Sequence, residues 1–171
     1  LATGSDALLL GPRDRALGPV EFSPGSDLIY VRDDENDIIH RLPLLGGTPE
    51  PIHGPVRDFA LDAAGRRLAI ARQDSTVGTV EIIDLATKET RHLDGTFQFN
   101  WGLALAWSTD GEAVVVSEFD FGTSSARIHR LPVDGGPAPP AVGGWSRIVD
   151  LHRLRDGSGL VLAGNRRTGT G

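Results

Sequence analysis

The sequence HRLPLLGG occupies residues 40–47, and the closely similar HRLPVDGG occupies residues 129–136. Six of the eight letters are identical, and the two copies begin 89 residues apart. Between them lies EIIDLATKET, in which Leu85 takes the place of Leu42 and Leu131, at separations of 43 and 46 residues. The chain therefore contains an internal repeat, and a repeat of this length must be recognised before any fold is assigned.

A second phrase recurs at a similar spacing and precedes the first one. Its four copies read FSPGSDLIYV, LDAAGRRLAIA, WSTDGEAVVVS and RLRDGSGLVLA. Aligning Leu28, Leu68, Val114 and Leu160 gives spacings of 40, 46 and 46 residues. Each copy has a short apolar stretch, a tight turn containing Gly, and a second stretch rich in Ile, Leu and Val, which together are typical of a β-hairpin.

The complete unit predicts four short strands, because an alternating third stretch and a weaker fourth one follow each hairpin. Four strands in about 40–45 residues are the signature of propeller blades. We therefore predict an all-β fold, a β-propeller of four-stranded antiparallel blades, with about three to four blades in this chain. The alternative, a β-sandwich, gives no reason for a fixed period. No segment shows helical periodicity over ten or more residues.

The recurring phrase resembles the WD40-like (PD40) repeat of TolB-type propellers, in which an aromatic residue precedes Ser-Pro-Asp-Gly and a β-branched stretch. WSTDGEAVVV and FSPGSDLIYV are the best copies, and the resemblance covers about residues 20–165. Gly25 stands where the family has Asp, and that copy reads as one residue short. The resemblance implies a propeller module of a larger bacterial protein. It slightly favours a periplasmic or other extracytoplasmic location, which the residues themselves leave open.

The repeat divides residues 1–171 into approximate blades within a single propeller domain or part of one. These are residues 20–56, 57–100, 101–146 and an incomplete 147–171, with residues 1–19 as candidate outer strands of an adjoining or closing blade. Either those residues close a four-bladed ring, or the chain is a fragment of a larger propeller. An open propeller exposes a strand edge and an apolar blade face, so we expect it to self-associate.

Composition and motifs exclude several functions. The chain has no Cys, and its 17 basic and 23 acidic residues give a net charge of −6, with no basic stripe for nucleic acid. No apolar run approaches the ~18 residues of a membrane span. Gly-x-Ser-x-Gly is absent, so no nucleophile elbow is present. The acidic run RDDENDI has Ile38 where a calcium loop needs Gly. We expect no metal, no cofactor and no catalytic site within this chain.

Histidines and inner-strand carboxylates do not form a catalytic cluster in the sequence. His40 and His129 occupy equivalent repeat positions, which indicates a shared structural role. Asp58, Asp150 and His152 are the inner-strand candidates, and they are too few for a propeller enzyme, which normally gathers several such groups around its channel.

The candidate binding site is one face of the predicted propeller, where loops between second and third strands meet loops between blades. This loop face gathers aromatic and acidic side chains: Asp33, Asp34, Asp37, Phe97, Phe99, Trp101, Glu118, Phe119, Asp120, Phe121 and Trp145. Aromatic rings beside carboxylates suit a cationic or partly apolar partner, such as a basic peptide segment. Large aromatic residues are also often buried, which is the competing interpretation of the tryptophans.

The sequence is compatible with two functions. The first is a non-enzymatic β-propeller module that binds a protein, peptide or ligand as the sensor or interaction part of a larger bacterial protein. The alternative is the substrate-gating propeller of a prolyl-oligopeptidase-type serine peptidase, whose catalytic domain would lie outside this chain.

Overall fold

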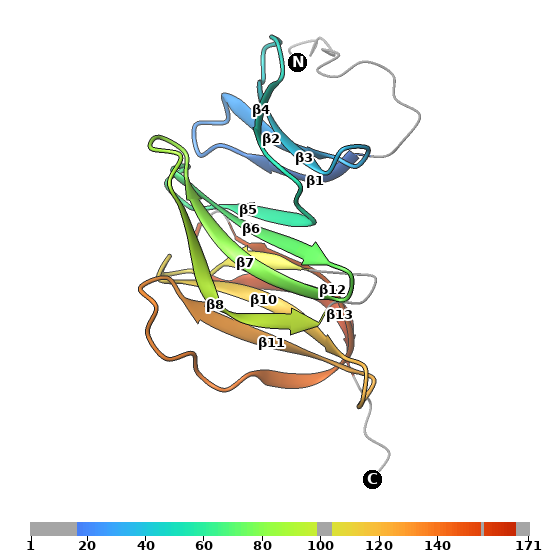
Figure 1. Ribbon diagram of the computed structural model, residues 1–171. Helices are drawn as coiled ribbons and strands as arrows, with labels where there is room; N and C mark the ends of the chain where they lie inside the picture. Colours follow the sequence, from blue (N-terminus) through green and yellow to red (C-terminus); the bar gives the residue numbers. More distant parts are fainter. Residues whose placement is uncertain (1–16, 99–103, 155, 167–171) are drawn as a thin grey trace, which may run out of the picture. The chain divides into compact units, whose positions relative to one another are not determined.

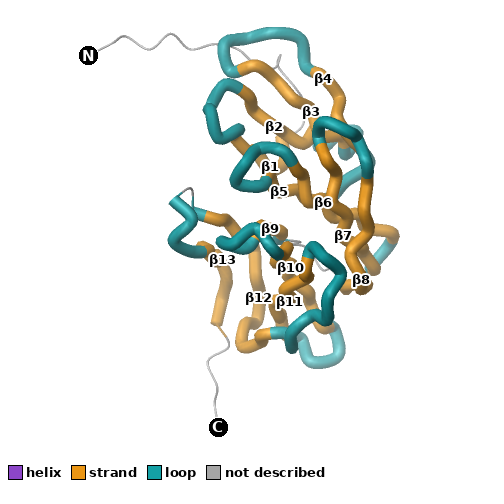
Figure 2. Tube along the Cα trace, turned by 90° about the vertical axis from the view of Figure 1, so that its left-hand side faces the viewer, coloured by secondary structure: helices purple, strands orange, loops and turns teal. Residues whose placement is uncertain are grey.

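The computed structural model describes residues 17–98, 104–154 and 156–166, and in these ranges the only regular elements are strands. The thirteen strands of these ranges form three antiparallel sheets (Figure 1). Strands and connecting loops alternate along the whole described trace (Figure 2). The prediction of an all-β fold made of antiparallel sheets is confirmed.

The first sheet belongs to a compact unit that ends at Val56, and it is described here by itself. Its strands, in spatial order, are β1 (Leu17–Phe22), β2 (Leu28–Asp33), β3 (Ile38–Pro43) and β4 (Glu50–His53). Each strand pairs with the next one along the chain, so the sheet is a simple meander.

The second compact unit, from Arg57 onward, holds the other two sheets. The second sheet is β5 (Asp58–Leu61), β6 (Arg67–Asp74), β7 (Val77–Asp84) and β8 (Thr90–Gln98). The third is β9 (Leu105–Trp107), β10 (Ala113–Asp120), β11 (Ser125–Pro132), β12 (Val142–Arg153) and β13 (Leu160–Arg166).

Strand β12 joins two repeats. Its first residues pair with β11, as the fourth strand of the third repeat, and its later residues pair with β13, as the first strand of the next. The expected boundary at residues 146 and 147 falls inside this continuous strand. The stretch APPAV, the expected fourth strand, lies before it except for Val142.

All four repeats use the same tight turn after the first strand. Its first residue is Ser23, Asp62, Ser108 or Leu154. In each copy this residue's amide donates to the carbonyl five residues on, and the amide three residues on donates back to its carbonyl, at 2.9–3.0 Å. The residue three positions on is left-handed in every copy, namely Ser26, Gly65, Gly111 and Gly157.

A side-chain oxygen strengthens three of these turns. Ser23 Oγ accepts the Leu28 amide at 3.0 Å, and Ser108 Oγ accepts that of Ala113 at 2.9 Å. Asp62 Oδ1 accepts the Arg67 amide at 3.1 Å. The bond satisfies a donor at the start of the second strand, which explains why Ser or Asp recurs before the turn.

The turns correct the sequence alignment. Because Ser23 and Ser108 are equivalent, the first copy is not a residue short. Ser26 adopts the positive φ of 54° that Gly adopts in the other copies. The residue equivalent to Val114 is then Ile29 rather than Leu28, and strand pairing agrees: Phe22 pairs with Ile29 as Trp107 pairs with Val114.

The phrase HRLP lies at the end of the third strand in two of the sheets, β3 in the first and β11 in the third. Leu42 and Leu131 are 2% and 3% exposed, and they pair with Ile29 and Val114. In the second sheet this place is taken by Ile83, which pairs with Leu68, so the predicted equivalence of Leu85 is wrong. The repeated Gly-Gly forms the turn that follows, with positive φ at its first Gly in both copies.

The second and third sheets pack face to face through an apolar core. Trp107 is 1% exposed, and its Nε1 donates to the Ala60 carbonyl at 2.9 Å, which joins β9 to β5. The remaining members come from both sheets: Ala69, Ala71, Val80, Ile82, Leu93, Phe97, Leu105, Val114, Val116 and Leu131. Small residues of β5 and β6 thus receive larger residues of β9 and β10.

A second core lies between β9–β11 and the β12–β13 pair. Ala104, Ala106, Val115 and Ala126 contact Ile148 and Leu151, with Leu162 partly buried against them. Repeat thus follows repeat through the same kind of face, with small residues on one side and larger residues on the other.

Candidate functional site

The two ends of strand β10 lead to two different surfaces of the third sheet, and each is a candidate binding site. The turn after Asp120 leads to β11 and belongs to the loop face that the sequence predicted. The turn before Ala113, at residues 108–112, lies at the opposite end of the same strand. The loop end and the hairpin end of the third sheet are therefore distinct surfaces.

In the first sheet, the predicted acidic residues of the loop face are bound within their own loop. Asp33 is 7% exposed, and its Oδ1 accepts the Glu35 amide at 3.0 Å. Arg32 forms an ion pair with Asp34 and lies 3.9 Å from a carboxylate oxygen of Asp37. Asp33 therefore builds the turn between β2 and β3 rather than standing open to a partner.

At the loop end of the third sheet, Glu118 is enclosed by basic and polar groups. His129 Nε2 lies 2.7 Å from one of its carboxylate oxygens, and Arg127 Nε lies 3.5 Å from the same oxygen. The other oxygen accepts the Gln98 amide at 3.3 Å. Glu118 thus connects β8, β10 and β11.

Asp120 performs the turn-building role that Asp33 has in the first sheet. Its Oδ1 accepts the amides of Gly122 at 2.9 Å and Thr123 at 3.2 Å, and its other oxygen forms an ion pair with Arg127. The Thr123 amide is the main cause that holds the pKa of Asp120 below its ordinary value. Local donors therefore already engage both carboxylate oxygens of Asp120.

Some of the aromatic side chains predicted for the loop face are exposed to solvent. Phe119 and Phe121 meet edge to face, with ring centroids 5.2 Å apart at 77°, and Phe121 is 47% exposed. Phe119 and Trp145 are half-buried against the core of the third sheet. The structure thus brings Glu118, Phe119, Asp120 and Phe121 together, with Trp145 paired opposite the neighbouring Ala126.

The prediction that Phe97 belongs to the loop face is wrong. It lies in β8 rather than in an exposed loop, it is 4% exposed, and its ring packs 5.1 Å from that of His129. The alternation of β8 turns it into the core, so it cannot contact a partner on the loop face. Phe99 and Trp101, the other predicted members of this stretch, lie outside the described residues.

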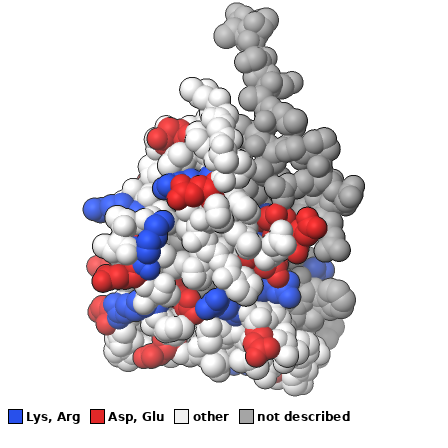
Figure 3. Space-filling view, turned by 45° about the horizontal axis from the view of Figure 1, so that its top comes forward, with Lys and Arg blue, Asp and Glu red and all other residues white. Residues whose placement is uncertain are grey.

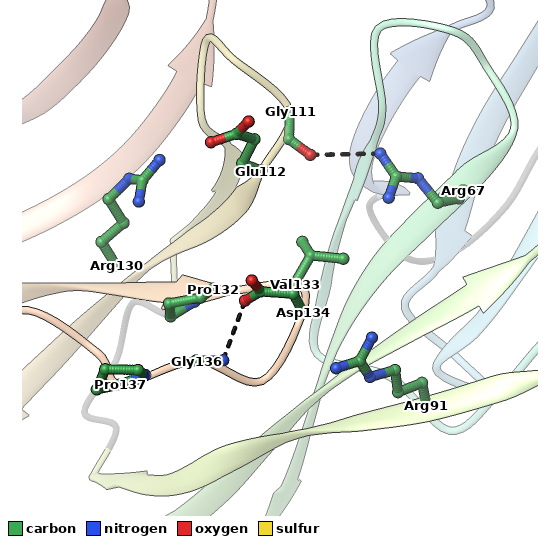
Figure 4. A pocket seen from close by; sticks show the side chains of 10 residues that line it. All are labelled: Arg67, Arg91, Gly111, Glu112, Arg130, Pro132, Val133, Asp134, Gly136 and Pro137. Atoms are coloured by element: carbon green, nitrogen blue, oxygen red, sulfur yellow. Dashed lines mark hydrogen bonds between the residues drawn. The ribbon is translucent and has the colours of Figure 1, made fainter.

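The hairpin end holds a groove between the second and third sheets, with a volume of about 640 Å³ (Figure 4). It is lined by three arginines, two carboxylates and a rim of small or apolar residues: Arg67, Arg91, Gly111, Glu112, Arg130, Pro132, Val133, Asp134, Gly136 and Pro137. Figure 4 shows Arg67 and Arg91 extending from the second sheet toward the turns of the third.

Two of these guanidinium groups are held by neighbouring acids. Arg67 Nε donates to Asp62 Oδ2 at 2.9 Å, while its guanidinium carbon lies 4.4 Å from the Trp107 ring centroid. Arg130 forms an ion pair with Asp110 at 2.7 Å. Such pairing fixes the direction of each planar group and leaves further N–H donors for a ligand.

Arg91 differs from the other two, since it makes no ion pair with any residue that the structure describes. A β-carbon placed on Gly135 would lie 3.1 Å from Arg91 Nη2, so the guanidinium lies directly over the Gly-Gly turn of the third sheet. Gly135 also has a φ of 81°, so both the turn and the arginine favour Gly there.

This groove is absent from the site predicted by the sequence, which comprises the loop face alone. A usable signal was present in the repeated HRLP phrase. Arg130 stands beside a buried leucine, so period-two alternation turns it away from that core. That Arg67 and Arg91 of the second sheet line one groove with Arg130 of the third could not be read from sequence, because these residues come together only after the sheets stack.

Charge is mixed rather than segregated on the visible surface. In Figure 3, basic and acidic side chains are interspersed on a surface that is otherwise uncharged. In the described ranges, no group of three or more His, Asp or Glu could hold a metal ion. No helix in the same ranges is long and apolar enough to cross a bilayer.

Comparison by sequence finds no relative: no family model matches the chain, and neither does any curated protein. Solved structures do match. TolB from Acinetobacter baumannii has a TM-score of 0.70 over 90% of this chain at 15% identity, and putative TolB from Agrobacterium tumefaciens has 0.66 over 88% at 17%. The β-propeller domain of the Trilobed protease from Pyrococcus furiosus has 0.54 over 74% at 12%.

These matches define the class of fold. The chain has the TolB-like β-propeller fold, as both the repeat and the resemblance of its turn phrase predicted. The matched part is 39% of the Acinetobacter chain, 55% of the Agrobacterium chain and 42% of the Pyrococcus chain. The chain thus spans less than two thirds of each of these three structures.

Proposed function

We propose that this chain is a non-catalytic β-propeller module that binds a protein or peptide partner, and that the groove at the hairpin end takes an acidic segment of that partner. The observation that carries the proposal is Arg91, a guanidinium without an ion pair among the described residues, over a groove of about 640 Å³. Arg67 and Arg130, already oriented by Asp62 and Asp110, offer further donors on the same lining.

The chemistry of the lining favours a peptide over a compact anion. Guanidinium groups bind carboxylates through paired N–H donors. Glu112 and Asp134 on the same lining would repel a dense negative charge, whereas Val133 and two prolines offer apolar contact to an extended chain. We therefore expect a segment in which acidic side chains alternate with others.

The test is a titration with a fluorescein-labelled peptide of alternating Glu and Ala, followed by anisotropy. We expect binding that weakens about 2- to 5-fold in Arg91→Ala, the effect of losing one exposed ion contact. Arg147→Ala, the same change at an exposed arginine of β12 away from the groove, should leave the affinity unchanged. Equal losses in the two variants, or no binding at all, would refute the groove proposal.

The predicted loop face remains a second candidate because Phe121 is 47% exposed beside Phe119. A labelled peptide of alternating Arg and Ala tests it: Phe121→Ala should weaken binding about 2- to 5-fold while far-ultraviolet circular dichroism stays unchanged. Equal affinity of wild type and variant would reject this site. Asp33 is not a suitable probe, because its buried carboxylate builds a turn and its replacement would disturb folding.

The alternative function, a propeller that gates substrate for a serine peptidase, is supported only by the fold of similar structures. Similar structures include the Trilobed protease propeller and an acylaminoacyl peptidase from Pyrococcus horikoshii, the latter with a TM-score of 0.53 at 12% identity. For this chain a gating role requires a peptidase domain in the same gene. A Gly-x-Ser-x-Gly segment with a downstream His in the full-length sequence would support it, and the lack of both would reject it.

A further inference from the structure

Strand β11 has an outer edge that the fourth strand of its repeat covers only in part. Strand β12 pairs with β11 at Ala126 and Ile128, and the pairing ends at Val142. Farther along β11, over residues 129–131, neither a strand pairing nor a backbone hydrogen bond joins this edge to another segment that the structure describes. The part of the edge next to the hairpin end is therefore open.

The other two sheets show what normally covers this part of the edge. Arg41 and Ile82 occupy the position of Arg130, one residue before the buried leucine or isoleucine of the third strand. Arg41 pairs with Glu50, and Ile82 pairs with Arg91. Among the described residues, Arg130 has no such partner on a fourth strand.

The sequence explains why the chain leaves this edge open. Residues 137–140 read PAPP and follow the Gly-Gly turn, where the fourth strand would begin. Proline has no amide hydrogen, so Pro137, Pro139 and Pro140 cannot donate to a sheet. All four residues are exposed, and in Figure 1 the chain runs as a loop between β11 and the start of β12. The prolines thus keep the protein's own chain from closing the edge.

The open edge presents one backbone donor and one backbone acceptor of the same residue. The Val133 amide donates to the Glu112 carbonyl at 2.8 Å, which fixes the backbone groups that face β10. In an antiparallel pair these groups alternate, so those of Leu131 also face β10 and those of Arg130 face outward. Such an edge is a template for an extended peptide that adds a strand to the sheet.

The first sheet shows which side chain suits the place opposite Arg130. There Arg41 and Glu50 form an ion pair across the third and fourth strands. Arg130 donates to Asp110 at 2.7 Å, but its side chain is 40% exposed and has further donors. Opposite charges directly across a strand pair stabilise the pairing. A strand with a carboxylate opposite Arg130 would repeat in the third sheet a contact that the first sheet already makes.

We propose that the acidic segment of the partner, whose binding in the groove is the proposed function on which this inference rests, adds as a strand to the open edge of β11. One acidic residue of the segment takes the place opposite Arg130 that Glu50 has opposite Arg41. Its amide donates to the Arg130 carbonyl, its carbonyl accepts the Arg130 amide, and its carboxylate meets the guanidinium. Arg130 and Arg91 line the same groove, so strand addition holds the segment there.

The first experiment compares three labelled peptides by anisotropy: the alternating Glu and Ala peptide, an analogue with every Glu amide N-methylated, and an analogue with every Ala amide N-methylated. In the proposed pairing the amide and the carboxylate that meet Arg130 belong to one residue. We therefore expect methylation at Glu to weaken binding about tenfold, through loss of a hydrogen bond to the edge. The Ala analogue has the same charge and is the matched control, and its affinity should be nearly that of the parent.

The second experiment observes the edge itself, by nuclear magnetic resonance measurement of amide hydrogen exchange in the full chain. With the parent peptide at about ten times its Kd, exchange at the Arg130 amide should slow about tenfold, because the bound form protects it. The Arg41 amide is the control, since it already faces Glu50, and its exchange should not change.

The outcomes separate the mode of binding from the binding itself. If the parent peptide binds but the two analogues lose affinity equally, or exchange at Arg130 stays the same, strand addition is overturned and the groove proposal stands. If the parent peptide does not bind, the proposed function fails and this inference fails with it.

Discussion

At the scale of single residues, Asp58 shows how one carboxylate can hold two sheets together. It is 8% exposed, and it accepts amides from β5 and from β9. Sequence alone presents Asp58 as a candidate catalytic acid, because an aspartate on an inner strand has the same appearance in either role. Only the stacking of the sheets distinguishes them.

Replacing Asp58 by Ala should lower the free energy of unfolding by about 2–4 kcal/mol, since two buried amides lose a charged acceptor. Urea unfolding monitored by circular dichroism measures the change. Asp150→Ala is the control, because it alters the equivalent residue where the side chain is 49% exposed, and it should cost less than about 0.5 kcal/mol in dilute solution. Equal costs at the two positions would contradict the assigned role of Asp58.

Residue-scale detail also marks the limits of prediction. The sequence favours a loop at Phe97 because Gly95 and the polar residues around it interrupt the apolar pattern. In the structure β8 continues to Gln98 through a shift in its pairing with β7, which turns Phe97 inward. Single-sequence reasoning cannot locate such an irregularity, because its cause is the pairing with the neighbouring strand.

At the scale of elements, the hairpin turn is the part of the fold that sequence predicts best. Its short phrase carries the left-handed residue in all four copies and the side-chain oxygen in three, so it identifies four equivalent turns without reference to distant residues. The exception is Ser26, whose positive φ is not expected for a residue other than Gly. That one substitution displaces the sequence alignment of the first copy by a residue.

The lowered pKa values of aspartates in the turns predict how the free energy of unfolding responds to acid. Hydrogen bonds to the carboxylate lower the pKa of five turn aspartates. The main donor is a hydroxyl in two cases, that of Ser23 for Asp27 and that of Ser108 for Asp110. It is a backbone amide for Asp84, Asp120 and Asp156. A lowered pKa contributes stability above the unfolded-state value of about 3.9, and the contribution is lost as the pH falls through the folded-state values.

The free energy of unfolding, measured by urea titration at a series of pH values, should therefore decrease as the pH falls below about 4. Ser108→Ala should reduce the steepness of that decrease, since it removes the main cause of the lowered pKa of Asp110. Stability that stays constant or rises on acidification from about pH 5 to strongly acidic solution would contradict this assignment.

At the scale of the whole molecule, the repeat predicts a series of sheets, and the β12 strand shows how one repeat passes into the next. In the sequence, the end of the third repeat and the start of the fourth read as separate strands. Gly143 and Gly144 lie in β12, where Gly144 has a φ of 112° and lets a single strand change partners. The hairpin-end groove depends on the stacking of the second and third sheets and was therefore beyond sequence reasoning.

The central claim is that each repeat folds into its own antiparallel meander, in which the second strand lies between the first and the third. The most direct test is nuclear magnetic resonance measurement of cross-strand contacts from β10. We expect proton–proton contacts from Val114 to both Trp107 and Leu131. Contacts from Val114 to the second strand of another repeat in place of these, or helical contacts along residues 113–120, would contradict the propeller fold.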